Sequence, residues 1–413
     1  MRTSSRRLTK SLLFLAGTAL LPVGNAHIPA FDLSEIRTIF SFGDSWTTTG
    51  YTPSEGIGDI NQTTTTSAGP TWVQYLAWNH TSAGASYYDL AALGSTVDTD
   101  VVYANGATDF AGQAGEFLAY FNSTTSTVEW DSATALFTIW FGNDDIYNCF
   151  ANGWNFIDVQ PRMLTAFDEQ VAKLYDAGAR NFLLLSLPSL DRTPLAESIS
   201  GASSTIQSAL EFWNARLEIY AMFLEAKYAD VQTKWFGARK WTAEILDDPS
   251  DHGFTNARTA CAAYSGLGYE PNANDSTCGF SLSSFFWKDL WRPTWRVHEM
   301  MASAIATLLS SETPSLVLPS SASSAVFSSS ATVNFSDISS ATSSLSPSPS
   351  SVVLTSTAMA TETSTSTVEP SATNTGGLRI GTNTNAAAGG AYDRRSGVTT
   401  VGMALAAVWW IAG

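Results

Sequence analysis

Four short motifs bring together the hydroxyl, carboxylate, amide and glycine residues that acyl-transfer chemistry uses. In chain order they are Gly43-Asp44-Ser45, Ala104-Asn105-Gly106-Ala107, Gly142-Asn143-Asp144, and Asp289 with Arg292-Pro293-Thr294. A serine hydroxyl is a poor nucleophile until a neighbouring base takes its proton. The negative charge that develops on the attacked carbonyl oxygen needs fixed N–H donors beside it. Because the first and third motifs directly follow apolar segments, the sequence predicts these groups at the ends of strands.

Nearly continuous apolar runs alternate with helical patterns along the chain. They predict strands at 36–42, 135–141 and 182–187, and helices through 164–174, 203–230 and 297–309. Gly178 is expected to end the first of these helices, and Pro293 to lie in the first turn of the last. Apolar runs without polar alternation are typical of strands buried on both faces of a parallel sheet. We therefore expect an α/β fold with a doubly wound, flavodoxin-like parallel sheet, whose functional residues lie at the carboxyl ends of the strands.

In this order the four motifs resemble those of the GDSL/SGNH hydrolases. The residues around them are similar to the fungal acetylesterases of carbohydrate esterase family 16: Phe40-Ser41-Phe42, the segment 188–194, and Phe286-Trp287. The resemblance covers about residues 36–309. It implies the SGNH hydrolase fold and a serine ester hydrolase, an acetylesterase that acts on plant or cell-wall carbohydrate. It also implies no metal and no organic cofactor.

The resemblance assigns a role to one or two residues of each motif. Ser45 would be the nucleophile, and Asp289 the catalytic carboxylate of the last motif. The N–H groups of Ser45 and Gly106 and the side-chain amide of Asn143 would form the oxyanion hole. An ordinary turn glycine and a helix cap are the alternatives for Gly106 and Asn143. The aspartates that directly precede Ser45 and follow Asn143 are expected to brace loops or cap helices rather than to react.

The last motif departs from the family at the position of the catalytic base. Arg292 stands before Pro293-Thr294, where the resemblance requires a histidine. A guanidinium stays protonated in proteins and has no lone pair to accept the serine proton. Loss of the base from a serine triad can lower turnover on the order of 10⁶-fold. We expect Arg292 either to form an ion pair with Asp289 or to hold a carboxylate-bearing ligand.

None of the four histidines replaces that base directly. His298 matches a second histidine of the family, six residues after position 292. On a helix, six residues rotate a side chain by about 240° and move it about 9 Å along the axis. His298 would therefore need a rearranged loop to act as the base, and the alternative is a packing role. The others are His27 beside a predicted cleavage site, His80 in a glycosylation sequon and His252 in a predicted surface turn.

Both ends of the chain have the composition of targeting segments. Residues 1–26 combine four basic residues with a short apolar run and a small-residue cleavage site, as in a secretory signal peptide. The hydrolase-like domain is expected at 27–310, followed at 311–385 by a disordered stalk, because half of positions 311–370 are Ser or Thr. Residues 386–413 resemble a GPI-attachment propeptide, with a small-residue run, a polar spacer and an apolar end. The protein is therefore expected to be secreted and held at the cell surface or cell wall, with a lipid anchor.

The net charge and the cysteine content limit which classes of partner the protein could bind and in which cellular compartment it could fold. A net charge of −16 excludes nucleic-acid binding, which needs a basic surface. Cys261 and Cys278 flank a loop rich in Gly, Asn and Asp and are expected to pair, which leaves Cys149 as a buried thiol. The sequons for N-glycosylation are at Asn61, Asn79, Asn122, Asn274 and Asn334. We expect a monomeric glycoprotein whose partner is an acetylated carbohydrate or another small ester.

A second hypothesis comes from a different functional class. If Arg292 abolishes turnover, the chain would be a non-catalytic carbohydrate-binding or structural cell-wall glycoprotein on the same fold. Its 14 tryptophans suit either function, because aromatic faces stack on sugars. Tryptophans are nevertheless more often core residues than ligand platforms. The identity of the proton acceptor at position 292 or elsewhere therefore decides between the two hypotheses.

Overall fold

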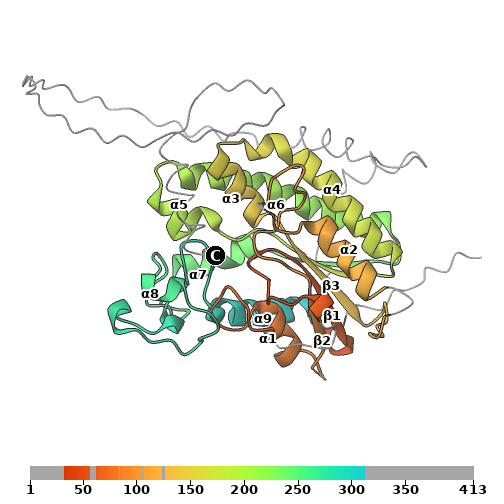
Figure 1. The fold of residues 1–413 in the computed structure, drawn as a ribbon, viewed down its shortest axis with the longest axis horizontal. Helices are drawn as coiled ribbons and strands as arrows, with labels where there is room; N and C mark the ends of the chain where they lie inside the picture. The colour runs from red at the N-terminus through yellow and green to blue at the C-terminus, as the bar shows by residue number, and fades with distance from the viewer. Residues whose placement is uncertain (1–31, 56–61, 83, 105, 123–125, 312–413) are drawn as a thin grey trace, which may run out of the picture. The chain divides into compact units, whose positions relative to one another are not determined.

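The computed structural model describes residues 32–55, 62–82, 84–104, 106–122 and 126–311 (Figure 1). The predicted signal peptide, stalk and anchor segments lie outside these residues, as do the sequons at Asn61 and Asn334. The chain divides into two units, residues 1–148 with 156–317, and residues 149–155 with 318–413. Of the second unit, the structure describes Cys149–Asn155, where the Trp154 N–H donates to the Cys149 carbonyl at 2.8 Å.

Within the described residues, five parallel strands form one sheet in the order β2-β1-β3-β4-β5. Their bounds are β1 Thr38–Gly43, β2 Ser86–Asp89, β3 Ala135–Trp140, β4 Asn181–Leu185 and β5 Gln232–Phe236. This order is that of doubly wound, flavodoxin-like sheets, so the predicted fold class is confirmed. Every residue of β1, β3 and β4 is buried, as their apolar runs predict.

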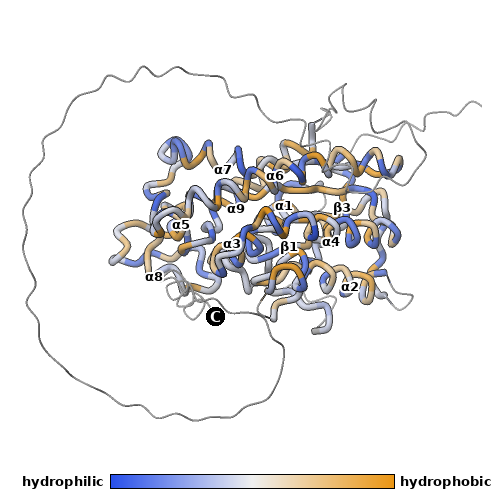
Figure 2. Tube along the Cα trace, turned by 90° about the horizontal axis from the view of Figure 1, so that it is seen from above, coloured by the Kyte–Doolittle hydropathy of each residue, from blue (hydrophilic) through white to orange (hydrophobic). Residues whose placement is uncertain are grey.

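Helices cover both faces of the sheet, with α1 and α9 packed together on one face and α2, α4 and α6 on the other (Figure 1). The helices are α1 Trp72–Asn79, α2 Phe110–Tyr120, α3 Asn143–Asn152, α4 Phe156–Asp176, α5 Pro194–Ser198, α6 Ala202–Lys227, α7 Ala238–Asp247, α8 Ala262–Ser265 and α9 Trp295–Leu309. Short 3₁₀ turns span Leu33–Glu35, Pro53–Glu55, Leu190–Arg192, Ser276–Cys278 and Leu282–Ser284. Hydrophobic and hydrophilic residues alternate along α4, which explains why its inner stripe could be recognised in the sequence (Figure 2).

Two helix ends test the predicted start and stop signals. Gly178 has φ +114°, and its N–H donates to the Tyr175 carbonyl, so the chain leaves α4 at the predicted glycine. Pro293, however, does not lie in the first turn of α9, because Thr294 is the N-cap and the helix begins at Trp295. The reason is that Pro293 pairs with Trp287 in an antiparallel bridge, which keeps the backbone extended one residue longer.

Tryptophans fill the core beneath the carboxyl edge of the sheet. Trp140 at the end of β3 lies edge-on to both Trp46 and Trp72, with ring centroids 5.6 and 6.2 Å away. Trp287 in turn packs against Trp46. These four rings are fully buried, so here the tryptophans are core residues rather than an exposed sugar platform.

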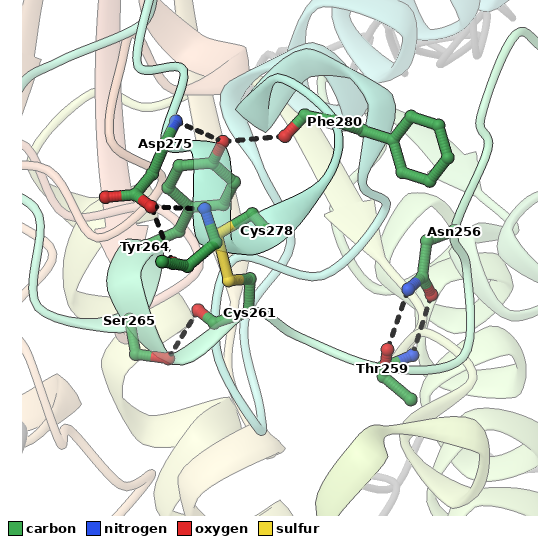
Figure 3. The surroundings of a disulfide bond; sticks show 9 residues. Asn256, Thr259, Cys261, Tyr264, Ser265, Asp275, Cys278 and Phe280 are labelled. Atoms are coloured by element: carbon green, nitrogen blue, oxygen red, sulfur yellow. Dashed lines mark hydrogen bonds between the residues drawn. A yellow bond between two sulfur atoms is a disulfide. The ribbon is translucent and has the colours of Figure 1, made fainter.

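A disulfide between Cys261 and Cys278 closes the loop that precedes the last motif, and this confirms the predicted pairing (Figure 3). Inside the loop, the Tyr264 hydroxyl accepts the Asp275 N–H at 2.9 Å and donates to the Phe280 carbonyl at 2.7 Å. Cys149 is buried as a thiol. Within the described ranges, no helix is long and apolar enough to cross a bilayer.

Candidate active site

A glycine allows β1 and β3 to approach closely where the first motif begins. A Cβ atom on Gly43 would lie 2.7 Å from the Trp140 carbonyl oxygen, closer than real Cβ contacts allow. The side chain of Gln113 from α2 binds the same residue twice, accepting the Gly43 N–H at 2.9 Å and donating to its carbonyl at 2.8 Å. This approach places Asp44 and Ser45 beside the end of β3, as the resemblance requires.

The third motif begins at a second constrained glycine. Gly142 has φ +121°, and a Cβ there would lie 2.8 Å from Trp213 Nε1. The backbone can therefore turn from β3 into α3, whose first residue is Asn143. The Asn143 Nδ2 amide donates to both carboxylate oxygens of Asp44, at 3.2 and 3.0 Å. This bond joins the first motif to the third.

Asp44 has the bracing role that the sequence predicts for it. Besides the Asn143 amide, its carboxyl accepts the Trp46 N–H at 3.0 Å, and its backbone carbonyl accepts two N–H groups of the following turn. Burial, and next the charge of Asp144, raise the pKa of Asp44 well above the usual carboxyl range. The amide predicted to bind the oxyanion is thus held by a buried carboxyl group, and this fixes its position.

Ser45 is buried in this turn, with 2% of its surface exposed. The Thr66 hydroxyl donates to its carbonyl and anchors its backbone. Its Oγ has no hydrogen-bond partner among the described residues. A buried hydroxyl without a partner is costly in a folded protein, so this atom marks a place where a ligand would complete the site.

Gly106 lies on an exposed turn, closed by a hydrogen bond from the Ala107 N–H to the Ala104 carbonyl at 2.9 Å. Its φ is +88°, a conformation that favours glycine, and a Cβ there would meet no atom within 4 Å. The turn therefore accounts for a glycine at this position whether or not its N–H binds an oxyanion. The oxyanion role of Gly106, like that of Asn143, stays a prediction.

Asp289 and Arg292 form the predicted ion pair within a tight turn. Arg292 Nε donates to Asp289 Oδ2 at 2.8 Å, and both side chains are largely buried. Asp289 Oδ1 also accepts the backbone N–H groups of Trp291 and Arg292, at 2.9 and 2.8 Å. The carboxylate thus has three donors. It holds position 292 in the manner of a triad carboxylate that orients its base, but here the oriented group is a guanidinium.

His298 lies inside the packing between α9 and α1. Its Nδ1 accepts the Trp72 N–H at 3.3 Å, at the first turn of α1. Complete burial lowers the pKa of His298 to about 3, so the ring is neutral at physiological pH. Its Nε2 is buried without a hydrogen-bond partner among the described residues. These contacts are those of a packing histidine.

The sequence does not reveal the groups that surround Asp144. This residue, expected to brace a loop or cap a helix, lies in the first turn of α3, with 6% of its surface exposed. Burial raises the pKa of Asp144 to about 6, against the opposing effects of the Arg292 charge and of the N–H and hydroxyl of Ser45. The carboxyl group thus interacts with both Ser45 and the Arg292 charge. Asp144 directly follows Asn143 at a strand end, and this position was the available signal that it belongs to the site. Nothing in the sequence, however, shows that Arg292 interacts with it.

Several buried polar atoms of the motifs and of the residues beside them have no hydrogen-bond partner within the described residues. They are Ser45 Oγ, Asp144 Oδ2, Asn143 Oδ1, Tyr147 OH and Trp291 Nε1. The rings of Tyr147 and Trp291 contact each other at 5.3 Å between centroids, so α3 and the Asp289–Arg292 turn are in contact here. Unpartnered atoms from all of these segments therefore gather where a substrate with polar groups would find donors and acceptors.

Other buried charges surround the same edge of the sheet. Burial raises the pKa of Asp89 to about 8 and raises that of Asp145 well above the usual carboxyl range. Both carboxyl groups accept backbone N–H groups, from Ala91 and Val97 respectively. In the part of the chain that the structure describes, no three His, Cys, Asp or Glu side chains are grouped as a metal site. These acids therefore act as bracing groups for the loops around Ser45.

Comparison with known proteins identifies the family. The model of GDSL-like lipases and acylhydrolases matches residues 39–305. The chain is 27% identical over 312 residues to an acetylesterase of Thermothelomyces thermophilus, covering 71% of this chain and 96% of that protein. It is 25% identical over 251 residues to a GDSL esterase/lipase of Arabidopsis thaliana, covering 55% and 67%. An extracellular lipase structure from Streptomyces rimosus aligns with a TM-score of 0.32 and 13% identity over 66% of this chain and 99% of that one. Since the family match spans the whole sheet and all of the motifs, the chain belongs to the GDSL-like lipases and acylhydrolases, a family of ester hydrolases.

Proposed function

We propose that the protein is a secreted acetylesterase that removes acetyl groups from plant or cell-wall carbohydrate, with Ser45 as its nucleophile. One observation carries the proposal: Ser45 Oγ is buried without a hydrogen-bond partner in the described structure, at the carboxyl edge of the sheet. The similarity to an acetylesterase over 96% of that protein supports the acetyl ester as substrate.

In the proposed reaction, Ser45 Oγ bonds to the acetyl carbonyl carbon while a base takes its proton. The N–H groups of Ser45 and Gly106 and the Asn143 amide would bind the oxyanion. The sugar hydroxyl leaves with a proton and an acetyl-Ser45 ester remains. Water then cleaves this ester to give acetate and restores the serine. Every step uses protein groups and water alone.

The proposed function is tested with the full chain on an aryl acetate and on an acetylated oligosaccharide. We expect turnover of both substrates by the natural protein. A Ser45→Ala variant should lose it by a factor on the order of 10⁶, the cost of removing a serine nucleophile. Equal hydrolysis by the two proteins, or release of acetate by neither, would overturn the proposal.

A second candidate function is favoured by the ion pair between Arg292 and Asp289. In this second function, the protein has the hydrolase fold but is a non-catalytic carbohydrate-binding or structural cell-wall glycoprotein. An Arg292→His variant discriminates between the two, because imidazole at this position restores the expected base. If only the variant hydrolyses the aryl acetate, the non-catalytic function holds. Comparable rates in both proteins mean that another residue already serves as the base.

The proposed cellular location is outside the cell, on the surface or in the wall, with a signal peptide and a GPI anchor. Three sequon asparagines lie on the exposed surface, Asn79, Asn122 and Asn274, where glycosylation is sterically open. The disulfide also suits an oxidising compartment. Treatment with an N-glycosidase should lower the apparent mass of the protein, and a phosphatidylinositol-specific phospholipase should release it from cells. Retention in the cytoplasm without glycans would contradict this location.

A further inference from the structure

The proposed hydrolysis leaves one requirement open, since Ser45 needs a proton acceptor and position 292 cannot supply one. We propose that the Asp144 carboxylate is this acceptor and that Arg292 is a positioning residue that acts through it. This inference rests on the proposed ester hydrolysis and names the base for it. It also gives Arg292 a function in a family whose pattern calls for histidine there.

The fold brings the two groups together through the close approach of β1 and β3. Ser45 lies two residues beyond Gly43, whose position against Trp140 leaves no room for a Cβ. Asp144 lies in the first turn of α3, which starts three residues beyond Trp140. Both Ser45 Oγ and Asp144 Oδ2 are buried, and neither has a hydrogen-bond partner among the described residues. The Asp144 carboxyl interacts with both the N–H and the hydroxyl of Ser45, so a hydroxyl donor and a carboxylate acceptor lie close together. Catalytic hydrogen bonds often tighten only when substrate binds.

The other buried acids of this edge are already engaged. Asp44 accepts the Asn143 amide and the Trp46 N–H. Asp145 accepts the Val97 N–H with both carboxylate oxygens. These contacts tie the Asp44 carboxyl to Asn143 and Trp46, and the Asp145 carboxyl to the backbone at Val97. Asp144 differs because it interacts with the serine and keeps an oxygen without a hydrogen-bond partner among the described residues. Asp89 also keeps such an oxygen, but its interactions are with Thr49 and Ala91.

Of three further candidates, Asp289 is occupied and His298 is misplaced. Asp289 has three donors in its own turn. His298 is neutral and lies against Trp72, between α1 and α9. Lys288 is the one rival base that these contacts do not remove, because burial lowers the pKa of its amine to about 8. The test must therefore separate a carboxyl base from an amine base.

The charges around Asp144 suit a base that works near neutral pH. Asp44 and Asp145 are buried beside it, and burial first, with a contribution from the Asp144 charge, raises the pKa of each well above the usual carboxyl range. Tyr147 faces it from the same helix and interacts with both Asp144 and Arg292. The Arg292 charge opposes the burial of Asp144, and the resulting pKa of Asp144 is about 6. Lys288 and Asp289 contribute opposite charges near Arg292. A base is most effective when its pKa lies near the working pH.

The proton balance closes with these groups alone. Asp144 takes the Ser45 hydroxyl proton as Oγ bonds to the carbonyl carbon. The protonated carboxyl then gives that proton to the departing alcohol oxygen as the C–O bond breaks. In the second half, Asp144 takes a proton from the attacking water and returns it to Ser45 Oγ. The acetyl-Ser45 intermediate has one proton fewer, which left with the alcohol, and the water proton restores the starting number over the complete cycle.

The first test is the pH dependence of kcat/KM for an aryl acetate with the full chain. We expect activity to fall as the pH drops through about 6, since Asp144 is then protonated. An Asp144→Asn variant should lose kcat on the order of 10³-fold, the usual contribution of a general base. The matched control is Asp158→Asn, an exposed acid in the first turn of α4, as Asp144 is in the first turn of α3; it should keep both the rate and the inflection.

Two further variants keep the inference decidable if Asp144→Asn folds poorly. Removing the guanidinium in Arg292→Gln should move the inflection upward by about one pH unit, because a nearby cation lowers a carboxyl pKa by one unit or more. Formate added to Asp144→Ala should restore turnover, since a small carboxylate can occupy the space left by the side chain.

The outcomes separate this inference from the proposed function. No turnover by the natural protein at any pH contradicts the proposed function itself. Turnover that persists in Asp144→Asn with its inflection unchanged contradicts the role of Asp144 alone. An inflection near 8 that disappears in Lys288→Met assigns the base to the lysine and also overturns the inference.

Discussion

Arg292 links the chemistry of the site to its electrostatics. Its Nε is bound to Asp289, and its charge lowers the pKa of Asp144 against the effect of burial. A histidine at this position would be the base itself, whereas arginine can act only through a neighbouring acid. The pairing of Arg292 with Asp289 could be predicted from their spacing in a turn. The approach of Arg292 to Asp144 could not, because it depends on how two distant segments fold together.

A double variant tests this division of roles at the residue scale. We expect Asp144→Asn to lose most of its turnover, and Asp144→Asn combined with Arg292→His to regain it. Asp289 already accepts the backbone N–H of position 292 and a side-chain N–H from it, so an imidazole there would be oriented as a base. The measurement is kcat for an aryl acetate in the two variants. A double variant as inactive as the single one would contradict the account.

At the scale of elements, the ends of β1 and β3 position the site. The strands β1, β3 and β4 were predictable, because each is a continuous apolar run buried on both faces. The edge strands β2 and β5 were missed, since both are short and carry polar or partly exposed residues. The helix α3 was missed as well, and with it the reason why Asp144 faces Ser45. The helix begins directly at the strand end with the polar residues Asn143, Asp144 and Asp145, so no apolar stripe marks its start in the sequence.

The close contact between β1 and β3 predicts that adding one methyl group at Gly43 lowers the stability of the folded protein. Gly43→Ala would place a Cβ 2.7 Å from the Trp140 carbonyl, so the strand ends must separate. We expect a loss of about 1–3 kcal/mol in the free energy of unfolding, as for other overpacked positions. Urea denaturation measures it. The control is Gly115→Ala at an exposed position of α2, where the added Cβ meets nothing within 4 Å. Equal stability of the two variants would show that the strands are not in close contact.

The burial of His298 between α1 and α9 predicts how the free energy of unfolding depends on pH. His298 has a pKa of about 3 in the folded protein, below the ordinary value of 6.5. As the pH falls, protons therefore bind His298 in the unfolded chain before they bind it in the folded protein. The folded state loses stability relative to the unfolded state as the pH falls from 6.5 toward 3. The expected slope is about 1.4 kcal/mol per pH unit. Buried acids with raised pKa values act in the opposite direction, so the slope is measured as the difference between the natural protein and His298→Gln. A difference that does not change with pH would contradict the burial of His298.

At the scale of the molecule, the disulfide loop supports the segment that leads into the last motif. Tyr264 and Phe285 pack with Leu282 on Ala68, beside the Cys261–Cys278 bond. The pairing was predictable from composition, because the two cysteines flank a loop rich in turn residues. Its role as a brace was not, since the contacts with Ala68 join segments far apart in the sequence.

Removing both cysteines tests that support. We expect the Cys261→Ser/Cys278→Ser variant to lose about 3 kcal/mol of stability, the chain-entropy estimate for a loop of this length. The free energy of unfolding from urea titration gives the value, and the same titration of the natural protein with dithiothreitol should give a similar loss. An unchanged midpoint in both would mean that the loop is held by its other contacts.

The most direct measurement for the central claim is covalent labelling of the full chain by a serine-directed phosphonate, located by mass spectrometry. The account predicts label on Ser45 alone, at a rate that rises with pH through about 6 and then levels, following the ionisation of Asp144. It also predicts that Asp144→Asn labels far more slowly. Label on a different serine, or no label at any pH, would contradict the claim that Ser45 is an activated nucleophile.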